Sequence, residues 1–427
     1  MNNQIEITFG ETGRAITGKT PSSDDPEDFG EGYPFVTPTD SLDSKYVLHT
    51  ARQLSEEGLR KLKSKALPPN SILVSCIGSA MGKVVMNSTT CITNQQFNSI
   101  VVDTARFCPH YVYYALRNSY KLLRNAASGS TALPMLNKTD FEKLKIRVFK
   151  DKAHQRKIAA VLSALDAKIA LNHRINSELE GMAKLLYDYW FVQYDFPLSA
   201  AQAAALGKPR LAGKPYRTSG GPMVYHDQLK REIPKGWQVG DLSELCHLNH
   251  RTWPNKDHPA QVTYLDLANA KNGEILSVQN FAWDEAPSRA RRILTPGDTI
   301  FGTVRPGNRS FALVPKSEET LTGSTGFAVL TPKSPIYREF NYLSLTSESN
   351  IIRLTTVASG AAYPAVNPEV VAAQTIALPD TDLIQQFHQT TASFFDLIER
   401  HRAQNQELTT LRDWLLPMLM NGQVRVG

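Results

Sequence analysis

The chain has 427 residues, 41% of them hydrophobic and 21% charged, which allows two or three domains with substantial cores. No stretch approaches the ~20 consecutive apolar residues of a membrane helix, and the first residues lack a signal-peptide pattern, so we expect a cytoplasmic location and no membrane partner. The net charge of +6 permits a polyanionic partner without requiring one. The cysteines show no paired spacing such as C-x-x-C, so we expect reduced thiols and no metal site at Cys76, Cys91, Cys108 and Cys246.

Near the N-terminus, residues 13–20 fit the phosphate-loop pattern G-x-x-x-x-G-K-T. Such a loop needs a strand before it and a helix after it, whose first amides hold the phosphates. Residues 5–9 could form the strand, but residues 21–30 contain scattered Pro and Gly and almost no apolar face. We therefore expect no nucleotide site here.

Short strands separated by turns follow in the first half of the chain and return in the second half. Runs of apolar and β-branched residues bounded by turn residues predict strands in strand-rich, mixed α/β domains. The predicted strands are residues 72–75, 84–87, 100–102, 298–302 and 311–314.

Two segments, 155–191 and 384–420, predict long helices of about 55 Å at 1.5 Å per residue. In each segment, residues spaced alternately four and three apart form one stripe along the helix. Such a stripe favours packing of the two helices against each other, and packing of each helix on its own domain is the alternative. Four polar stripe residues, Asn172, Asn176, His401 and Asn405, are candidates for fixing the register of the pair. The stripes are Ile158, Leu162, Leu165, Ile169, Asn172, Asn176, Leu179, Ala183 and Leu186, and Phe387, Thr391, Phe394, Ile398, His401, Asn405, Leu408, Arg412 and Leu415.

The two halves repeat each other. The long helices align at a constant offset, Ala127-Ser128-Gly129 with Pro134 and Asn137 matches Ala358-Ser359-Gly360 with Pro364 and Asn367, and residues 67–73 resemble 294–300. This pattern predicts a tandem duplication. The second copy opens with Ile233-Pro234 and Trp237, whereas the first starts near Ile5 without a counterpart, so we expect a first copy that lacks its first strand or begins upstream. The expected segments are domains at 1–150 and 231–380, helical spacers at 151–197 and 381–427, and an Ala/Gly-rich linker at 198–230.

The chain lacks recognisable catalytic motifs. We find no Asn/Asp-Pro-Pro-aromatic tetrapeptide of an amino-methylating enzyme, no carboxylates clustered with lysine, and no G-x-S-x-G elbow. The remaining candidates for a functional role are polar and basic residues near turns, including residues 60–65.

Arginine pairs well with guanine, Asn or Gln with adenine, and lysine with phosphate, although a solvated surface is the simpler interpretation of each residue alone. Residues 305–309 lie in the loop that corresponds to 78–82, as two domains with different half-sites would require. The DNA-binding candidates are Lys19, Thr20, Lys83, Asn94 and Gln95 in the first half, and Arg251, Arg289, Arg292, Arg305, Asn308 and Arg309 in the second.

Residues 155–169, 172–180 and 185–191 resemble the central helical region of type I restriction-modification specificity subunits. Residues 213–221 and 233–237 look like that family's linker and second-domain opening, and residues 17–22 with 33–40 resemble the start of a target-recognition domain. The resemblance covers nearly the whole chain. It implies an α+β fold with two mixed α/β target-recognition domains, separated by two long helices that form an antiparallel coiled coil.

The resemblance also implies function. Each domain would recognise one half of a bipartite site in double-stranded DNA, and the helices would set the gap between the halves. The chain itself would be non-catalytic and bind no cofactor. It would dock two methyltransferase subunits carrying S-adenosylmethionine and restriction subunits that use ATP and Mg.

The outward faces of the helices would carry the anchors for the methyltransferase subunits, because Tyr and Trp dominate interface hot spots. The candidates are Tyr187, Tyr189, Trp190 and Trp414, with burial against the recognition domains as the alternative. Two other functions compete with this interpretation. A self-sufficient DNA methyltransferase or nuclease is disfavoured by the missing motifs. A DNA-binding regulator or architectural coiled-coil protein would work without restriction partners.

Overall fold

The computed structural model describes residues 4–426 except 23, 79, 127–134, 255, 317–318 and 361. The chain forms two compact units. The first unit comprises Met1–Arg174 with His401–Gly427, and the second comprises Ile175–Arg400. Each unit therefore contains one mixed α/β region and a part of each long helix.

The first unit is built around a four-stranded antiparallel sheet in the order β2-β8-β5-β6. A second sheet has the order β4-β3-β7, with β3 and β7 parallel, and β1 pairs with β9. Ile72, Leu73 and Val74 of β5 are fully buried, as expected of a strand covered on both faces. The strands are β1 Gln4–Thr8, β2 Gly13–Thr17, β3 Phe29–Val36, β4 Arg52–Leu54, β5 Ile72–Ser75, β6 Val84–Met86, β7 Ile92–Thr93, β8 Phe97–Val102 and β9 Lys145–Phe149.

Both long helices contribute to the core of the first unit. Ile158 and Leu162 from one helix and Leu416 and Leu419 from the other pack in the same cluster as Ile72. Shorter helices complete the unit, of which α2 begins with proline at its first position, where no amide partner is needed. They are α1 Glu56–Lys61, α2 Pro109–Asn118, α3 Tyr120–Ala126 and α4 Lys138–Lys143.

The second unit repeats the strand pairing of the first. Its four-stranded sheet has the order β13-β22-β19-β20, its second sheet the order β17-β14-β21-β18 with β14 and β21 parallel, and β12 pairs with β23. The tandem duplication is therefore confirmed in the pairing of the strands. The strands are β12 Gln238–Asp241, β13 Cys246–Leu248, β14 Gln261–Leu265, β17 Gln279–Ala282, β18 Ala290–Ile293, β19 Thr299–Gly302, β20 Phe311–Leu313, β21 Leu321–Ser324, β22 Phe327–Pro332 and β23 Thr375–Leu378, beside the short pairs β10 Met223–His226 with β11 Arg231–Pro234 and β15 Ala270–Lys271 with β16 Glu274–Ile275.

The alternative that the first copy lacks its first strand is wrong for the strand that follows the Ile-Pro motif. Strand β1 pairs with β9 in the first unit as β12 pairs with β23 in the second. The Ile233-Pro234 motif lies in β11, which pairs with β10 and precedes β12, so this motif does not mark the counterpart of β1.

The linker segment, residues 198–230, contains regular structure. It contains helix α6 and strand β10, and Phe196 stacks on Tyr216 and Trp237 with ring centroids 4.7 and 5.4 Å apart. Three aromatic rings thus hold a segment whose Ala/Gly-rich composition predicts little structure. The shorter helices of the second unit are α6 Ala200–Ala205, α7 Arg338–Leu345, α8 Glu348–Val357 and α9 Pro368–Ala372.

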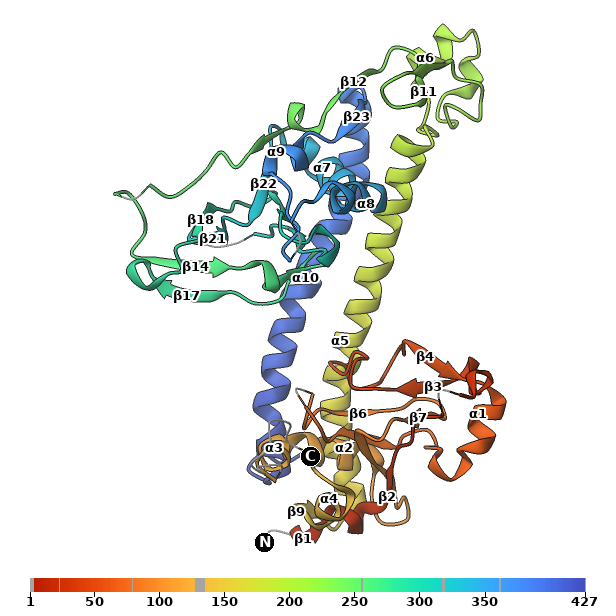
Figure 1. The fold of residues 1–427 in the computed structure, drawn as a ribbon, viewed down its shortest axis with the longest axis vertical. Coiled ribbons are helices and arrows are strands. Elements are labelled where there is room, and N and C mark those ends of the chain that lie inside the picture. Colours follow the sequence, from red (N-terminus) through yellow and green to blue (C-terminus); the bar gives the residue numbers. More distant parts are fainter. Residues whose placement is uncertain are drawn as a thin grey trace. The chain divides into compact units, whose positions relative to one another are not determined.

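The two predicted long helices are α5 Lys152–Tyr187, which continues into a π-helical turn at Asp188–Val192, and α10 Thr381–Met420 (Figure 1). Every stripe position predicted from the sequence is buried or half-buried. In the first unit, Asp166 of α5 contacts Arg412 while Asn172 contacts Asn405, so the residue numbers run in opposite directions and the helices are antiparallel. Among the described residues, no helix is both long and apolar enough to cross a lipid bilayer.

Candidate nucleic-acid interface

Three loops of the first unit meet at one end of its four-stranded sheet. Thr17 at the end of β2 is opposite Asn98 near the start of β8, and Ser75 at the end of β5 is opposite Phe97. Because neighbouring strands are antiparallel, the segment after β2, the turn before β8 and the β5–β6 loop share this end. We call it the loop end of the sheet.

The loop end brings together four of the five candidates that are far apart in the sequence. The Lys19 amide donates to the Thr93 carbonyl at 2.9 Å, and the Thr20 hydroxyl donates to Gln95 Oε1 at 2.7 Å. Asn94 Nδ2 donates to the Gln96 side chain at 2.8 Å. Lys19 and Gln95 are exposed. The site thus combines a lysine for phosphate with two oriented amides suited to a base edge.

The two glycines of the phosphate-loop pattern lie where a neighbouring backbone segment approaches closely. A Cβ on Gly13 would lie 2.2 Å from the Val101 carbonyl oxygen, and one on Gly18 would lie 2.2 Å from the Asn94 carbonyl oxygen. Residues 13–17 form strand β2 rather than a loop leading into a helix. The pattern therefore marks a close approach of two backbones.

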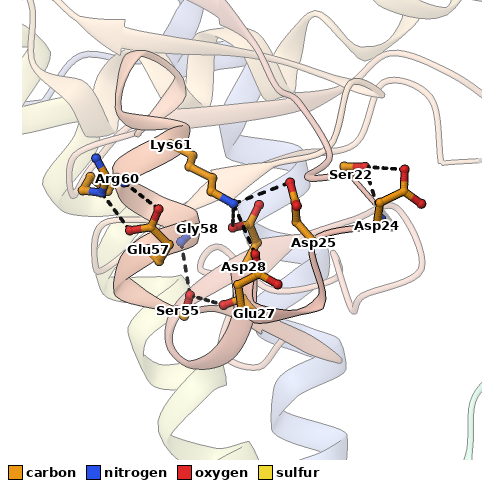
Figure 2. A network of polar contacts seen from close by, with 10 residues as sticks. All are labelled: Ser22, Asp24, Asp25, Glu27, Asp28, Ser55, Glu57, Gly58, Arg60 and Lys61. Atoms are coloured by element: carbon orange, nitrogen blue, oxygen red, sulfur yellow. Dashed lines mark hydrogen bonds and ion pairs between the residues drawn. The ribbon is translucent and has the colours of Figure 1, made fainter.

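Three acidic residues of the segment that follows lie around Lys61, as Figure 2 shows. Lys61 Nζ lies 2.8 Å from Asp28, 3.5 Å from Asp25 and 3.6 Å from Glu27, and its hydrogen bond to Asp28 raises the pKa of the lysine. Its neighbour Arg60 pairs with a glutamate one turn earlier on α1 at 2.6 Å. These two cations are held by carboxylates of the domain and are weak candidates for phosphate.

Lys83, the fifth candidate of this unit, is also paired internally. Its ammonium lies 2.7 Å from Asp43, and both residues line a cleft of 840 Å³. Arg117 and Asp413, which line the same cleft, are 3.6 Å apart. Ser79, in the loop between β5 and β6 near Lys83, lies outside the described residues.

The second unit has the same loop end. Leu248 at the end of β13 is opposite Leu330, and Gly302 at the end of β19 is opposite Phe327 at the start of β22. The segment after β13, the β21–β22 turn and the β19–β20 loop therefore meet. These loops contain Arg251, Arg305, Asn308 and Arg309. The Arg289 carbonyl accepts from the Thr325 amide in the β21–β22 turn. The Arg292 guanidinium donates to the Asn249 carbonyl and the Thr252 hydroxyl in the segment after β13.

The six candidates of the second unit differ in how available they are. Arg309 donates to both carboxylate oxygens of Glu348 at 2.6 and 2.7 Å, so its charge is neutralised within the domain. Arg292 is half-buried, and burial lowers its pKa. The exposed candidates are Arg251, Arg289, Arg305 and Asn308. Sequence reasoning missed the neighbouring Tyr363, which lies inside the repeated Ala-Ser-Gly motif and contacts Arg305.

Two of the four aromatic anchor candidates are not on an outward face. Tyr187 and Trp190 are 7% and 8% exposed; both pack on Phe387 of α10, and Tyr187 also packs on Phe340 of α7. The i and i+3 spacing puts them on one side of the helix, and that side faces the core. Tyr189 and Trp414 are exposed. Trp414 lines a shallow apolar groove on α10 together with Gln406, Glu407, Thr410 and Leu411.

The polar register candidates lie in the helix stripe. Asn172 is fully buried and its Nδ2 donates to Asn405 Oδ1 and Gln404 Oε1, each at 2.8 Å. Asn405 Nδ2 is 3.5 Å from the Ile169 carbonyl oxygen. Asn176 is buried in the second unit, and His401 is half-buried in the first. A buried amide pair of this kind disfavours other alignments of the helices.

A buried polar network joins the mixed α/β region of the first unit to the long helices. Asp166 of α5 accepts from Tyr114 at 2.5 Å and from Arg412 of α10 at 2.8 Å. Lys45 donates to Ser163 at 2.7 Å, and its burial lowers the pKa of the ammonium to about 8. In the second unit, the buried Glu339 accepts in a similar way from helix α10 and from its own neighbour. Its partners are His388 and Arg338, each at 2.6 Å.

Comparison with known proteins identifies the class. The family described as "Type I restriction modification DNA specificity domain" matches residues 5–181 and again residues 234–410. The chain therefore belongs to the type I restriction-modification specificity subunits, which are non-catalytic subunits. The described residues contain no cluster of three or more His, Cys, Asp and Glu arranged to hold a metal.

Individual relatives agree with the family. The chain is 23% identical over 423 residues to the type I restriction enzyme MjaIX specificity subunit of Methanocaldococcus jannaschii, covering 97% of this chain and 92% of that protein. It is 38% identical over 136 residues to the HindI specificity subunit of Haemophilus influenzae, covering 31% and 29%. The crystal structure of the S subunit from M. genitalium is similar in fold, with a TM-score of 0.55 at 14% identity over 98% of this chain and 96% of that one. The expected fold of two recognition domains and two packed long helices is confirmed.

Proposed function

We propose that this chain recognises a bipartite sequence in double-stranded DNA and directs methyltransferase and restriction subunits to it. Residues 1–150 and 231–380 would each recognise one half-site. The helical segments 151–197 and 381–427 would set the distance between the halves, and residues 198–230 would connect the copies.

One observation carries the proposal: the same sheet end in both units presents polar side chains, and those side chains differ. The first unit offers Asn94 and Gln95, whose amides suit adenine. The second offers exposed arginines, among them Arg251 and Arg305, which suit guanine. A duplicated scaffold with different side chains at one position is what two unlike half-sites require.

Affinity would come mainly from the cations. Lys19 in the first unit and Arg289 in the second are exposed and can neutralise phosphates, so binding would weaken steeply as salt concentration rises. Each good bidentate base contact would add ~1–3 kcal/mol of discrimination. Lys83, Arg292 and Arg309 would contribute less, because they are already paired or partly buried.

The partners follow from the family. Two methyltransferase subunits would bring S-adenosylmethionine, and restriction subunits would bring ATP and Mg, with no cofactor on this chain. Tyr189 and Trp414 remain as candidates for the methyltransferase interface, because both are exposed on the long helices.

The decisive experiment is methylome sequencing of cells that express this chain with its methyltransferase subunit, against cells that express the methyltransferase subunit alone. We expect chain-dependent adenine methylation at a motif of two halves with a fixed gap. Exchanging residues 1–150 for those of another specificity subunit should change one half only. A short continuous motif would contradict the bipartite proposal, and DNA binding without any methylation would favour a regulator.

A further inference from the structure

We propose that Tyr363, presented by Arg305, is a DNA-contacting residue of the second unit, whose exposed ring face packs against a base or a deoxyribose. The inference rests on the proposed function and adds a residue to it. It also gives a role to the Ala-Ser-Gly motif of the second copy.

The backbone attaches the Tyr363 segment to the loop end of the sheet. Ser359 and Ala365 exchange backbone hydrogen bonds at 3.0 and 2.9 Å, which join the two ends of the segment. The Arg305 amide donates to the Pro364 carbonyl at 2.7 Å, and the Val366 amide donates to the Thr303 carbonyl at 3.0 Å. The loop is thus joined at two points to the β19–β20 loop.

The Arg305 side chain then holds the aromatic ring. Its guanidinium donates to the Ala362 carbonyl at 2.9 Å and lies 4.7 Å from the centroid of the Tyr363 ring. Arg305 has a φ of +49°, a left-handed conformation that costs a non-glycine residue energy and persists only where neighbours impose it. The arginine and the ring are therefore positioned together by the loop.

The ring is open to a ligand. Tyr363 is 71% exposed although one side of it contacts a guanidinium, so most of the aromatic surface faces solvent. An arginine against an aromatic ring places a positive charge beside a flat apolar face. Nucleic acid offers the matching pair of groups, a phosphate next to a sugar and a base.

The surrounding charges favour DNA over a protein partner. Arg251 and Arg289 are exposed at the same loop end, and the nearby carboxylate of Glu348 is occupied by Arg309. A phosphate backbone presents a regular row of negative charges to such a group of cations, whereas a protein partner would need a matching set of carboxylates.

The test measures binding of the assembled complex of full chain and methyltransferase to a duplex that carries the methylated motif. The variants are Tyr363→Ala and Tyr363→Phe, with Tyr225→Ala as the matched control, since Tyr225 is also exposed but lies on the β10–β11 hairpin. We expect about tenfold weaker binding for Tyr363→Ala, near-normal binding for Tyr363→Phe because the ring is kept, and no change for the control.

Unchanged DNA affinity of Tyr363→Ala would overturn the inference. So would normal DNA affinity combined with loss of the methyltransferase subunit on gel filtration, which would assign the residue to a protein interface. A wild-type complex that does not distinguish its motif from other duplexes would instead overturn the proposed function itself. Circular dichroism of each variant separates a local effect from unfolding.

Discussion

The guanidinium of Arg412 donates to the carboxylate of Asp166 at 2.8 Å, joining α10 to α5 across 246 residues of sequence. Both side chains are buried, and Asp166 also accepts from Tyr114 of the recognition region. One carboxylate therefore connects three elements of the first unit.

Removing the arginine should destabilise this unit strongly. Arg412→Ala leaves the buried Asp166 with one partner fewer, and breaking a buried ion pair costs ~3–5 kcal/mol. Urea unfolding of the full chain measures the loss. Arg156→Ala, at an exposed position of α5, serves as the control and should change stability by less than ~0.5 kcal/mol. An Arg412→Ala effect no larger than that control would mean that solvent replaces the arginine.

The amide pair in the helix stripe should lower stability while fixing register. Asn172→Leu combined with Asn405→Leu replaces two buried amides by apolar side chains, so we expect the midpoint of thermal unfolding to rise by a few degrees. Asn172→Ala alone should lower it, because the Asn405 amide then loses a partner at a cost of ~1–3 kcal/mol. Circular dichroism during heating gives both midpoints, and a double Leu variant that unfolds below the wild type would refute the argument.

The buried ammonium of Lys45 should give stability a specific pH dependence. Its pKa is lowered from 10.5 to about 8 by burial, which the nearby Asp166 opposes. Below pH 8 the lysine is charged in both folded and unfolded chains, and the cost of burying that charge is fully present. Between pH 8 and 10.5 the unfolded chain binds more protons, so stability rises with pH. Lys45→Met should therefore gain most over the wild type below pH 8.

Comparison of the Lys45→Met variant with the wild type isolates the contribution of the lysine to the pH dependence. Burial raises the pKa values of Tyr46, Tyr113 and Tyr114, and these phenols occur in both chains, so their contribution largely cancels. His110, whose pKa is lowered by burial and by Lys45, titrates below the window. Urea midpoints from pH 6 to 11 test the prediction, and a difference that stays constant across pH 8 to 10.5 would contradict it.

Salt dependence should separate cations that contact phosphate from those that do not. Lys19→Ala removes an exposed lysine of the loop end, and the slope of log K against log salt should become shallower by ~1. Arg60→Ala removes the same charge from a residue paired with Glu57, and its slope should stay that of the wild type. Fluorescence titrations at several salt concentrations provide both slopes. Equal slopes for all three proteins would exclude Lys19 from the phosphate contacts.

The sequence determined the large-scale organisation of this protein. The duplication, the two long helices and the strands around residues 72, 84 and 299 can be inferred from local periodicity and internal repetition. Both are properties of the sequence itself and do not depend on tertiary contacts. The absence of an apolar face after residues 13–20 was enough to argue against a phosphate loop there.

Only the tertiary structure decided which candidate side chains are available. Arg309 and Lys83 are as basic as Arg305 and Lys19 in the sequence, yet the fold pairs them with Glu348 and Asp43, each about 40 residues away. Tyr187 and Trp190 pack on Phe387, which is about 200 residues distant, and strand β1 was recognised as a repeat only through its partner. Charge pairing and burial depend on neighbours brought together by folding, and a residue type alone does not specify those neighbours.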